Sequence, residues 1–389
     1  MWVLIAIAII ILVTLWLQTS HSSKSEPTYP VRHSDMTFFV NGHRLFQHYI
    51  EDIRNAKSWI CVQFFIIKND LFGHHILTVL QEKASSGVPV YLLIDQMGSR
   101  TIAKDKIETL KQAGVQVVYS NRVSIKHPIQ SINERNHRKI TVIDGHIGYL
   151  GGFNVGNQYI NQGDQFSRWR DYHMRLTGEI IEDLSDQFIF DWRHNTSESI
   201  TLPKTELDRG NTQMQLIASS GGTLESTFLD LINSAQETIQ IGSPYFIPSK
   251  QLKALLIEKL KAGVHIDILY PHDSDHPFVK EASAPYLREM AKYGASVYLF
   301  YRGFYHAKSL IIDGKVADVG TANFDLRSLY LNEEVNMLIK DETAVKTVQG
   351  YFNRDLRAAM PLYDAWFKTP NALVFHIKKC LARVLRFYL

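Results

Sequence analysis

The sequence predicts an α/β fold made of two similar halves that together form one active site. Three observations predict it: strands alternate with helices, the order of these elements occurs twice, and one short polar motif occurs in each half. Alternating strands and helices are typical of α/β layers around a largely buried sheet. Because the whole order recurs, we interpret the chain as an internal duplication.

The N-terminal residues 1–20 predict a transmembrane anchor. Residues 2–17 are apolar apart from Thr14, which is near the lower length limit for a spanning helix. A cleaved signal peptide is the alternative, but no Lys or Arg precedes the run and no small-residue cleavage site follows it. Lys24 and Arg32 follow the run. The positive-inside rule therefore favours a single-pass protein of the cell membrane with a cytoplasmic catalytic body.

The rest of the chain divides into a linker and two domains. Residues 21–35, rich in Ser, Pro and His, are interpreted as the linker. The first domain is expected over 36–205 and the second over 206–370, because Pro, Asp and Gly punctuate residues 201–211.

Each half is expected to contain the same run of elements. A helix ends at an alanine before a strand, a second helix ends at a Gly-Val pair that opens another strand, and a third helix ends at a glycine before a β-rich run. The landmarks are Ala56, Gly87 and Gly114 in the first half and Ala235, Gly263 and Gly294 in the second.

The C-terminal residues 371–389 predict a basic amphipathic helix. One face carries Leu373, Ile377, Leu381, Val384 and Tyr388, and another carries His376, Lys379, Arg383 and Arg386. Such a helix can lie in a membrane interface beside anionic headgroups. A helix docked on the protein body with a solvated basic face is the alternative.

A polar motif in each half carries the functional signal. It reads His-x-Lys-x4-Asp, with a glycine and an asparagine seven and ten residues after the aspartate. The first copy contains His137, Lys139, Asp144, Gly151 and Asn154, and the second contains His306, Lys308, Asp313, Gly320 and Asn323. Alternation along a strand puts His and Lys on one face, and the Asp-Gly pair predicts a hairpin turn. Two histidines allow one to attack while the other protonates a leaving group.

This inventory suits phosphoryl chemistry. Lysines and asparagines can neutralise a phosphodiester without a metal, and imidazole can attack phosphorus directly. No zinc-type Cys/His spacing and no His-Glu-x-x-His pattern is present, so neither a metal nor another cofactor is expected. Asp144 and Asp313 are included among the catalytic candidates, although aspartate at a hairpin turn is common for structural reasons alone.

Other polar residues near the motifs receive a simpler interpretation. Arg135 and Arg138 flank the first histidine and are expected to be solvated surface residues rather than phosphate ligands. His173 is a further candidate because it follows Asp171 on an alternating strand. The remaining histidines expected on the surface or in loops are His74, His75, His272 and His276.

The paired motifs, continued as Gly-Gly-Phe-Asn154 and Gly-Thr-Ala-Asn323, resemble the phospholipase D superfamily. The resemblance extends over about residues 36–365. Within this range, three less specific stretches resemble the bacterial cardiolipin synthase branch of the superfamily. These are Trp169-Arg-Asp171, Ser243-Pro-Tyr-Phe246, and Asn323-Phe-Asp-Leu-Arg-Ser328 followed by Asn332-Glu-Glu334-Val-Asn336. The resemblance implies two phospholipase D-like α/β/α sandwich domains sharing one active site.

The resemblance also implies a metal-independent, two-step phosphatidyl transfer. It assigns attack to His137 and acid–base work to His306, although the sequence does not establish which histidine attacks. By position it implies that Asp171 and Glu334 orient the imidazoles, while Asn154 and Asn323 bind substrate. Glu333, where the family pattern has an aromatic residue, departs from the expected motif. A cardiolipin synthase would join two molecules of the anionic lipid phosphatidylglycerol at a membrane and release glycerol.

Three alternatives are compatible with the sequence. A hydrolytic phospholipase D would use water in the second step. A nuclease-type member would need a basic groove with interleaved aromatics, which a net charge of +3 and an anchor argue against, so no nucleic-acid partner is expected. A catalytically inactive membrane scaffold is disfavoured because His, Lys and Asn are intact in both halves. The oligomeric state is left open.

Overall fold

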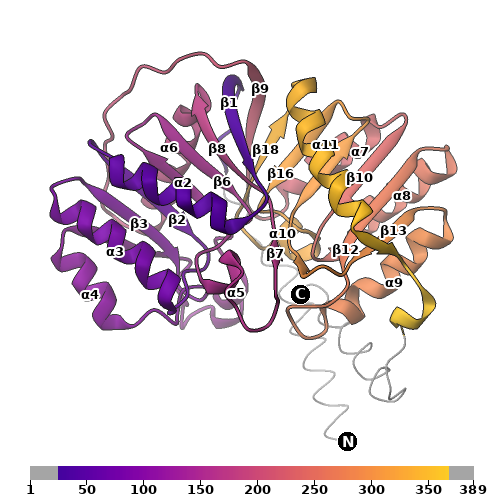
Figure 1. The fold of residues 1–389 in the computed structure, drawn as a ribbon, viewed down its shortest axis with the longest axis horizontal. Helices are drawn as coiled ribbons and strands as arrows, with labels where there is room; N and C mark the ends of the chain where they lie inside the picture. The colour runs from indigo at the N-terminus through magenta and orange to yellow at the C-terminus, as the bar shows by residue number, and fades with distance from the viewer. Residues whose placement is uncertain (1–24, 368–389) are drawn as a thin grey trace, which may run out of the picture.

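The two halves of the chain repeat one order of strands and helices, as the sequence predicts (Figure 1). The computed structural model describes residues 25–367. The first half contains β1 (Val31–Phe39), α2 (Gly42–Asn55), β2 (Ile60–Phe64), α3 (Leu71–Ser85), β3 (Val90–Asp95), α4 (Lys104–Gln112), β4 (Val115–Ser120), α5 (Pro128–Asn133), β5 (Ile140–Ile143), β6 (Ile147–Gly151), β7 (Trp169–Arg170), β8 (His173–Gly178) and α6 (Ile180–Asn195).

The second half follows after residues 196–211, which form neither helix nor strand. It contains β9 (Thr212–Ser219), α7 (Thr223–Ser234), β10 (Thr238–Gly242), β11 (Phe246–Ile247), α8 (Lys250–Lys261), β12 (His265–Pro271), α9 (Val279–Lys292), β13 (Ser296–Phe300), β14 (Phe304–Tyr305), β15 (Ser309–Ile312), β16 (Val316–Gly320), β17 (Phe324–Asp325), α10 (Leu326–Tyr330), β18 (Glu334–Ile339), α11 (Glu342–Arg357) and β19 (Ala359–Pro361).

One sheet of 15 strands runs through both halves in the order β19-β13-β12-β10-β15-β16-β18-β9-β1-β8-β6-β5-β2-β3-β4. Parallel strands β2-β3-β4 and β10-β12-β13 form its outer parts. The halves join where β1 pairs antiparallel with β9, from Val31 opposite Gln215 to Ser34 opposite Thr212. The duplicated units therefore share a continuous sheet.

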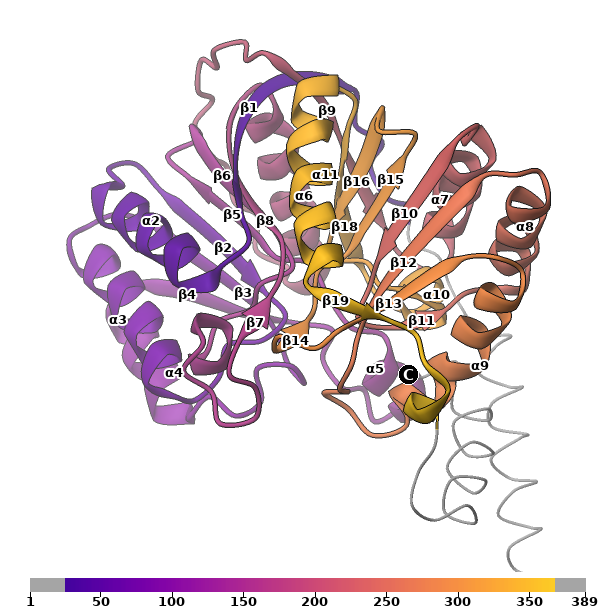
Figure 2. The ribbon, with the colours of Figure 1, turned by 45° about the vertical axis from the view of Figure 1, so that its right-hand side comes forward.

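Neighbouring residues of a strand point to opposite faces of the sheet, and both faces carry apolar side chains. Helices therefore cover both faces of each half. Ile140 and Val142 on β5 pack in the core that includes α6, whereas Ile143 packs in the core beneath α2, α3 and α4. In the second half, α7, α8 and α9 cover the face that corresponds to α2–α4. Helices α6 and α11 lie near the junction of the halves (Figure 2).

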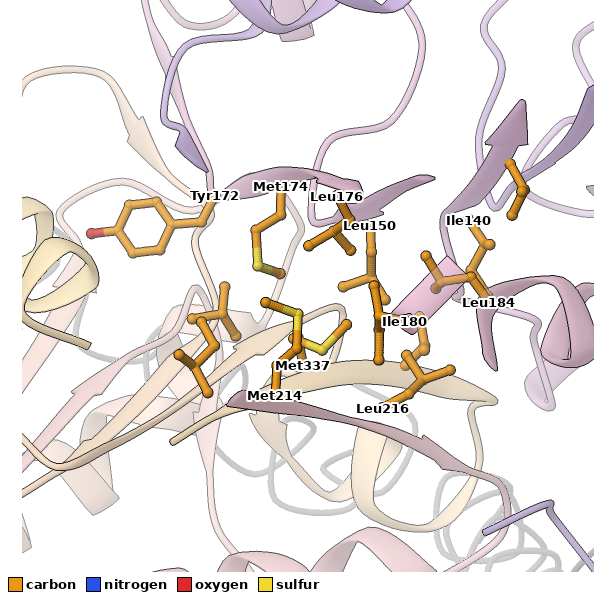
Figure 3. Packing of buried hydrophobic residues seen from close by; sticks show 14 of the residues in the cluster. Ile140, Leu150, Tyr172, Met174, Leu176, Ile180, Leu184, Met214, Leu216 and Met337 are labelled. Atoms are coloured by element: carbon orange, nitrogen blue, oxygen red, sulfur yellow. The ribbon is translucent and has the colours of Figure 1, made fainter. Parts of the chain in front are cut away.

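A shared apolar core fills this junction. Met174 on β8, Met214 on β9 and Met337 on β18 bring their side chains together there (Figure 3). Met174 and Met337 each lie three residues after the carboxylates Asp171 and Glu334. The segments that bear these two carboxylates are therefore anchored in one rigid core between the halves.

Both Asp-Gly pairs form the tight hairpins that the sequence predicts. Asp144 and Gly145 between β5 and β6 have φ values of 54° and 72°, and Asp313 and Gly314 between β15 and β16 have 51° and 62°. Positive φ at both central residues is the type I′ geometry that matches the right-handed twist of antiparallel strands.

The structure changes one boundary of the expected linker. Strand β1 begins at Val31, so residues 31–35 belong to the sheet rather than to the linker 21–35. The expected anchor over 1–20 and tail helix over 371–389 lie outside the described residues. Among helices built from residues 25–367, none combines the length and apolar character needed to cross a bilayer.

Candidate active site

Both motif histidines line one cavity of about 630 Å³ where the two halves meet. His137 lies three residues before the start of β5, which runs antiparallel to β2, and His306 lies three residues before the start of β15, which has the same relation to β10. The cavity therefore lies at the sheet edge where the parallel strands end, the usual position of ligand sites in α/β folds. Its wall also includes Phe65, Lys68, Asn154, Gln158, Trp169, Tyr245, Asp275, His276, Asn323, Arg327 and Asn332.

Short backbone pairings across the junction place each motif beside the opposite half. The His137 amide donates to the Glu333 carbonyl at 2.9 Å, and the His306 amide donates to the Arg170 carbonyl at 2.7 Å. The next residues in these partner segments are Glu334 and Asp171. Each histidine thus receives a carboxylate from the other half of the chain.

His137 is held by Glu334. Its Nδ1 lies 2.8 Å from Glu334 Oε2, and its ring makes an edge contact with Phe65. Three neutral donors complete the surroundings of this carboxylate: Thr321 Oγ1 at 2.6 Å, Ser328 Oγ at 2.8 Å and Asn332 Nδ2 at 3.1 Å. Glu334 is consequently fixed in position.

His306 is held by Asp171 in a different setting. Its Nδ1 lies 2.5 Å from Asp171 Oδ2, and Asp171 Oδ1 accepts the Tyr172 amide at 2.8 Å. Lys308 Nζ lies 3.9 Å from the same carboxylate. A Cβ on Gly152 would come within 2.1 Å of Asp171 Oδ1, so only glycine allows the backbone to pass this closely.

These contacts set the tautomer of both rings. An ionised carboxylate beside Nδ1 only accepts, so Nδ1 carries the proton and Nε2 holds the lone pair. At His306, Lys308 Nζ also lies 2.7 Å from Nδ1, but the Asp171 carboxylate at 2.5 Å is the closer partner. Both imidazoles contribute to the cavity wall, which makes Nε2 the nitrogen available to a ligand. The two rings can then act from two sides on one bound atom.

The electrostatics keep both histidines neutral without a ligand. Burial lowers the pKa of His137 to about 4 against the opposing effect of Glu334. Burial and Lys308 likewise lower the pKa of His306, although Asp171 opposes them. Burial would raise the pKa of Asp171, but Lys308 and His306 outweigh it, so this pKa is lowered. Burial would likewise raise the pKa of Glu334, but His137 and Lys139 outweigh it and lower that pKa. A bound phosphodiester would favour the protonated imidazole by its negative charge.

The two motif lysines are buried beside the histidines. Lys139 Nζ donates to the His137 carbonyl at 2.6 Å, and Lys308 Nζ donates to the His306 carbonyl. Burial lowers the pKa of Lys139 to about 7 and that of Lys308 to about 8, although Glu334 and Asp171 respectively oppose the shift. The positive charge of Lys308 also lowers the pKa of His137 and of Lys139, because like charges repel.

Asn154 and Asn323 join the two histidines in the cavity wall, whereas Lys139 and Lys308 lie behind it. Asn154 Oδ1 accepts the Ile66 amide at 3.1 Å, and the same side chain also hydrogen-bonds Tyr159. Asn323 Oδ1 is buried and has no hydrogen-bond partner within residues 25–367. Asn323 therefore retains an acceptor for a ligand, and Asn154 retains one of its two N–H donors.

Asp144 and Asp313 lie away from this group, at the two hairpin turns. The carboxylate of Asp144 accepts the amides of Lys57, Ser58 and Trp59 at 2.7 to 3.0 Å. Asp313 accepts the amides of Gln236, Glu237 and Thr238 at 2.7 to 2.9 Å. Neither lines the cavity. These contacts favour the structural interpretation that the sequence left open for both aspartates.

Arg135 and Arg138 are not surface residues, and that expectation was wrong. Both are almost completely buried. Arg135 pairs with Asp95 at 3.3 Å, and Arg138 forms ion pairs with Glu26 and Asp191. Arg138 Nε also donates to the Glu334 carbonyl at 3.0 Å. Arg138 thus ties the first motif to the partner segment that bears Glu334.

The remaining histidines separate as follows. His173 is buried on β8, and its Nδ1 has no hydrogen-bond partner within the described chain. Burial lowers its pKa to about 3, so it is neutral. His74, His75 and His276 are exposed and His272 is partly exposed, as expected; of these, His276 reaches the cavity rim.

Sequence reasoning missed several residues of the cavity wall. Arg327 and Asn332 follow the second motif and lie within the stretch that suggested the family, but they were given no role. Tyr245 and Asp275 come from two separate loops, and no repeated spacing marks either one. Among residues 25–367, no group of three or more His, Cys, Asp or Glu side chains is placed to hold a metal ion.

Comparisons with known proteins agree with this geometry. A family model described as "Cardiolipin synthase, PLD-like domain" matches residues 49–189 and 228–356. The chain is 41% identical over 359 residues to minor cardiolipin synthase ClsB of Bacillus subtilis, covering 91% of this chain and 90% of that protein. It is 36% identical to a cardiolipin synthase of Oceanobacillus iheyensis, covering 88% and 74% of the two chains.

The fold itself is similar to a solved structure of lower identity. The crystal structure of phosphatidylserine synthase from Haemophilus influenzae superposes with a TM-score of 0.70 at 16% identity, covering 93% of this chain and 97% of that one. This likeness bears on the fold alone. The family match and the two relatives show that the chain belongs to the cardiolipin synthase family of phospholipase D-like proteins.

Proposed function

We propose that the protein is a cardiolipin synthase that transfers a phosphatidyl group from one phosphatidylglycerol to another and releases glycerol. The observation that carries the proposal is the pair of histidines facing one cavity, each bound through Nδ1 to a carboxylate of the opposite half. A two-step transfer needs both a nucleophile and an acid–base group at one phosphorus. Relatives named cardiolipin synthases supply the substrate class.

In the first step, we assign attack on phosphorus to His137 Nε2. A P–N bond forms and the P–O bond to glycerol breaks, while protonated His306 gives its Nε2 proton to the leaving oxygen. Asp171 supports this acid because a carboxylate beside Nδ1 stabilises the imidazolium. Lys139, Lys308, Asn154 and Asn323 bind the non-bridging oxygens as charge grows on them.

In the second step, a hydroxyl of another phosphatidylglycerol replaces the departed glycerol. Neutral His306 takes the hydroxyl proton, the new P–O bond forms, and the P–N bond to His137 breaks. Glu334 supports the imidazolium character that His137 acquires while it is bonded to phosphorus. The enzyme then returns to its initial protonation state.

Both substrates are bilayer lipids, so the cavity must open at a membrane surface. We propose that residues 1–20 anchor the protein in the cell membrane, with the catalytic body on the cytoplasmic side. The basic residues of 371–389 would favour anionic lipid at the same surface.

The test is a product assay with the full-length protein in phosphatidylglycerol vesicles containing EDTA. Cardiolipin and glycerol are expected in equal amounts from the wild type, and neither from His137→Ala or His306→Ala. Phosphatidic acid as the main product would assign the enzyme to the hydrolases, because water would then be the acceptor. A strict need for an added divalent metal would contradict the metal-free mechanism.

A further inference from the structure

The cavity wall contains a carboxylate that the proposed chemistry does not use. Asp275 lies in the loop between β12 and α9, and its side chain is only 11% exposed. Tyr245 lies in the loop between β10 and β11, and its hydroxyl donates to the Asp275 carboxylate, 3.0 Å from each oxygen. A negative charge in a cavity for an anionic phosphodiester would repel the phosphate. Its partner is therefore a different part of the substrate.

Asp275 belongs to the His306 side of the cavity. Asp275 follows β12 and its partner Tyr245 follows β10, and β10 lies in the sheet between β12 and β15, the strand that His306 precedes. In the proposed mechanism the alcohol leaves and enters on the His306 side, since His306 exchanges its proton. Asp275 is thus located beside the alcohol rather than beside the nucleophile.

The hydrogen-bonding capacity of Asp275 suits an alcohol with several hydroxyls. An ionised carboxylate only accepts, and its two oxygens offer about four lone-pair sites. Tyr245 supplies one donor, and Nε2 of the exposed His276 imidazole lies 3.8 Å from Asp275 Oδ2, beyond hydrogen-bond distance. Acceptor sites consequently remain for hydroxyl donors from the cavity. The glycerol headgroup has two hydroxyls besides its ester oxygen, and hydroxyl–carboxylate bonds are charge-assisted.

We propose that Asp275, oriented by Tyr245, forms a subsite for the glycerol hydroxyls of the leaving and entering headgroups. The inference rests on the proposed function and adds the residue that selects a polyol over water or a simple alcohol. Asp275 accepts hydrogen bonds and takes no proton. In each step the only proton moved is the one exchanged between His306 and the reacting oxygen.

The experiment measures which alcohol the phosphatidyl-enzyme accepts. Full-length protein is given phosphatidyl-p-nitrophenol, whose leaving group has no hydroxyls, with glycerol, 1,2-propanediol or 1-propanol as acceptor. Release of p-nitrophenol reports formation of the phosphoenzyme, and the lipid products report the acceptor. In Asp275→Asn, the preference for glycerol over 1-propanol is expected to fall by about ten- to a hundredfold. Tyr245→Phe should lower the same preference less.

Two matched controls make the outcome decisive. Asp273→Asn changes a 68% exposed carboxylate of the same loop and should leave the preference unchanged. Equal thermal unfolding of the variants excludes loss of folding as the cause. If Asp275→Asn slows transfer to all three alcohols equally, Asp275 acts on His306 and the subsite is wrong; an unchanged preference also overturns it. Failure of the wild type to release p-nitrophenol, by contrast, would count against the proposed function itself.

Discussion

Glu334 belongs to the second half of the chain, yet its Oε2 lies 2.8 Å from Nδ1 of His137 in the first half. Asp171 of the first half holds His306 of the second in return. Neither half therefore contains a complete histidine–carboxylate pair. The duplication of the chain produces one site with two distinct imidazoles, because Glu334 is surrounded by neutral donors whereas Asp171 lies near Lys308.

Replacing the carboxylate of Glu334 should impair catalysis more than binding. Glu334→Gln is expected to lower kcat by about 10²- to 10⁴-fold with little change in KM, since the amide can hold the wrong tautomer of His137. Steady-state cardiolipin synthesis measures this. The matched control is Glu342→Gln, a 71% exposed glutamate on α11 that should behave as the wild type. A variant with normal kcat would remove Glu334 from the mechanism.

Replacing each histidine should have a different effect on a substrate whose leaving group needs no protonation. With phosphatidyl-p-nitrophenol, His306→Ala is expected to release about one equivalent of p-nitrophenol in a burst and then to stall, because nothing activates the second alcohol. His137→Ala should show no burst. Rapid-mixing absorbance and mass spectrometry of the trapped protein test both results. A burst in His137→Ala alone would show that His306 attacks phosphorus and that His137 is the acid–base group.

Activity should be confined to a pH window set by the lysines and by His137. Burial lowers the pKa of Lys139 to about 7 and of Lys308 to about 8, so both lose their charge as the pH rises through these values. The value of kcat/KM should then fall between about pH 7 and 8, since a neutral amine no longer attracts phosphate. Its acidic limb should lie near pH 4, where free His137 becomes protonated and cannot attack.

A pH–rate series on wild type and Lys139→Met checks this origin. The variant should be slower, and its alkaline limb should move toward pH 8, because only Lys308 still titrates. A profile that stays flat to pH 10 in the wild type would show that the lysines keep their charge in the working enzyme.

The sequence predicted what depends on local pattern. The Asp-Gly hairpins at Asp144 and Asp313 and the alternation of strands and helices follow from rules that act over a few residues. Arg138 was placed wrongly because its partners Glu26 and Asp191 lie more than 50 residues away along the chain. Asp275 was missed for the same reason, since only the folded chain brings its loop to the histidines.

The hairpin aspartates should matter for stability rather than for turnover. Asp313 accepts three amides, and burial, which would raise its pKa, is outweighed by these hydrogen bonds, so the pKa is lowered. Asp313→Asn should cost about 1–2 kcal/mol of unfolding free energy, because hydrogen bonds to an ionised acceptor stabilise more than those to a neutral amide oxygen, and should leave kcat nearly unchanged. Denaturant unfolding and product assays measure the two quantities. A large loss of kcat in fully folded protein would restore Asp313 to the catalytic group.

The pH dependence of this contribution has a defined sign. A carboxyl group with a lowered pKa in the folded state stabilises the protein above its unfolded pKa, near 4, and the effect is lost as the pH falls through the folded value. The difference in unfolding free energy between wild type and Asp313→Asn should therefore shrink on acidification below about pH 4. A difference that grows at low pH would contradict this explanation.

Arg138 should be a principal determinant of the junction between the halves. It is fully buried, pairs with Glu26 and Asp191, and donates to the Glu334 and Ser219 carbonyls at 3.0 Å. Arg138→Met leaves two carboxylates buried without their cation and should cost about 3–5 kcal/mol. The double variant Arg138→Met/Asp191→Asn should recover part of this loss, because one of the uncompensated charges is gone.

The loss in Arg138→Met should also depend on pH. Burial already raises the pKa of Asp191 to about 6 in the wild type, and removal of the guanidinium should raise it further. The folded variant then binds protons more readily than the unfolded chain, so its deficit should be smaller at pH 5 than at pH 8. Denaturant unfolding at both values, with the double variant alongside, measures it. An equal deficit at both pH values would mean that lost packing, rather than buried charge, causes the destabilisation.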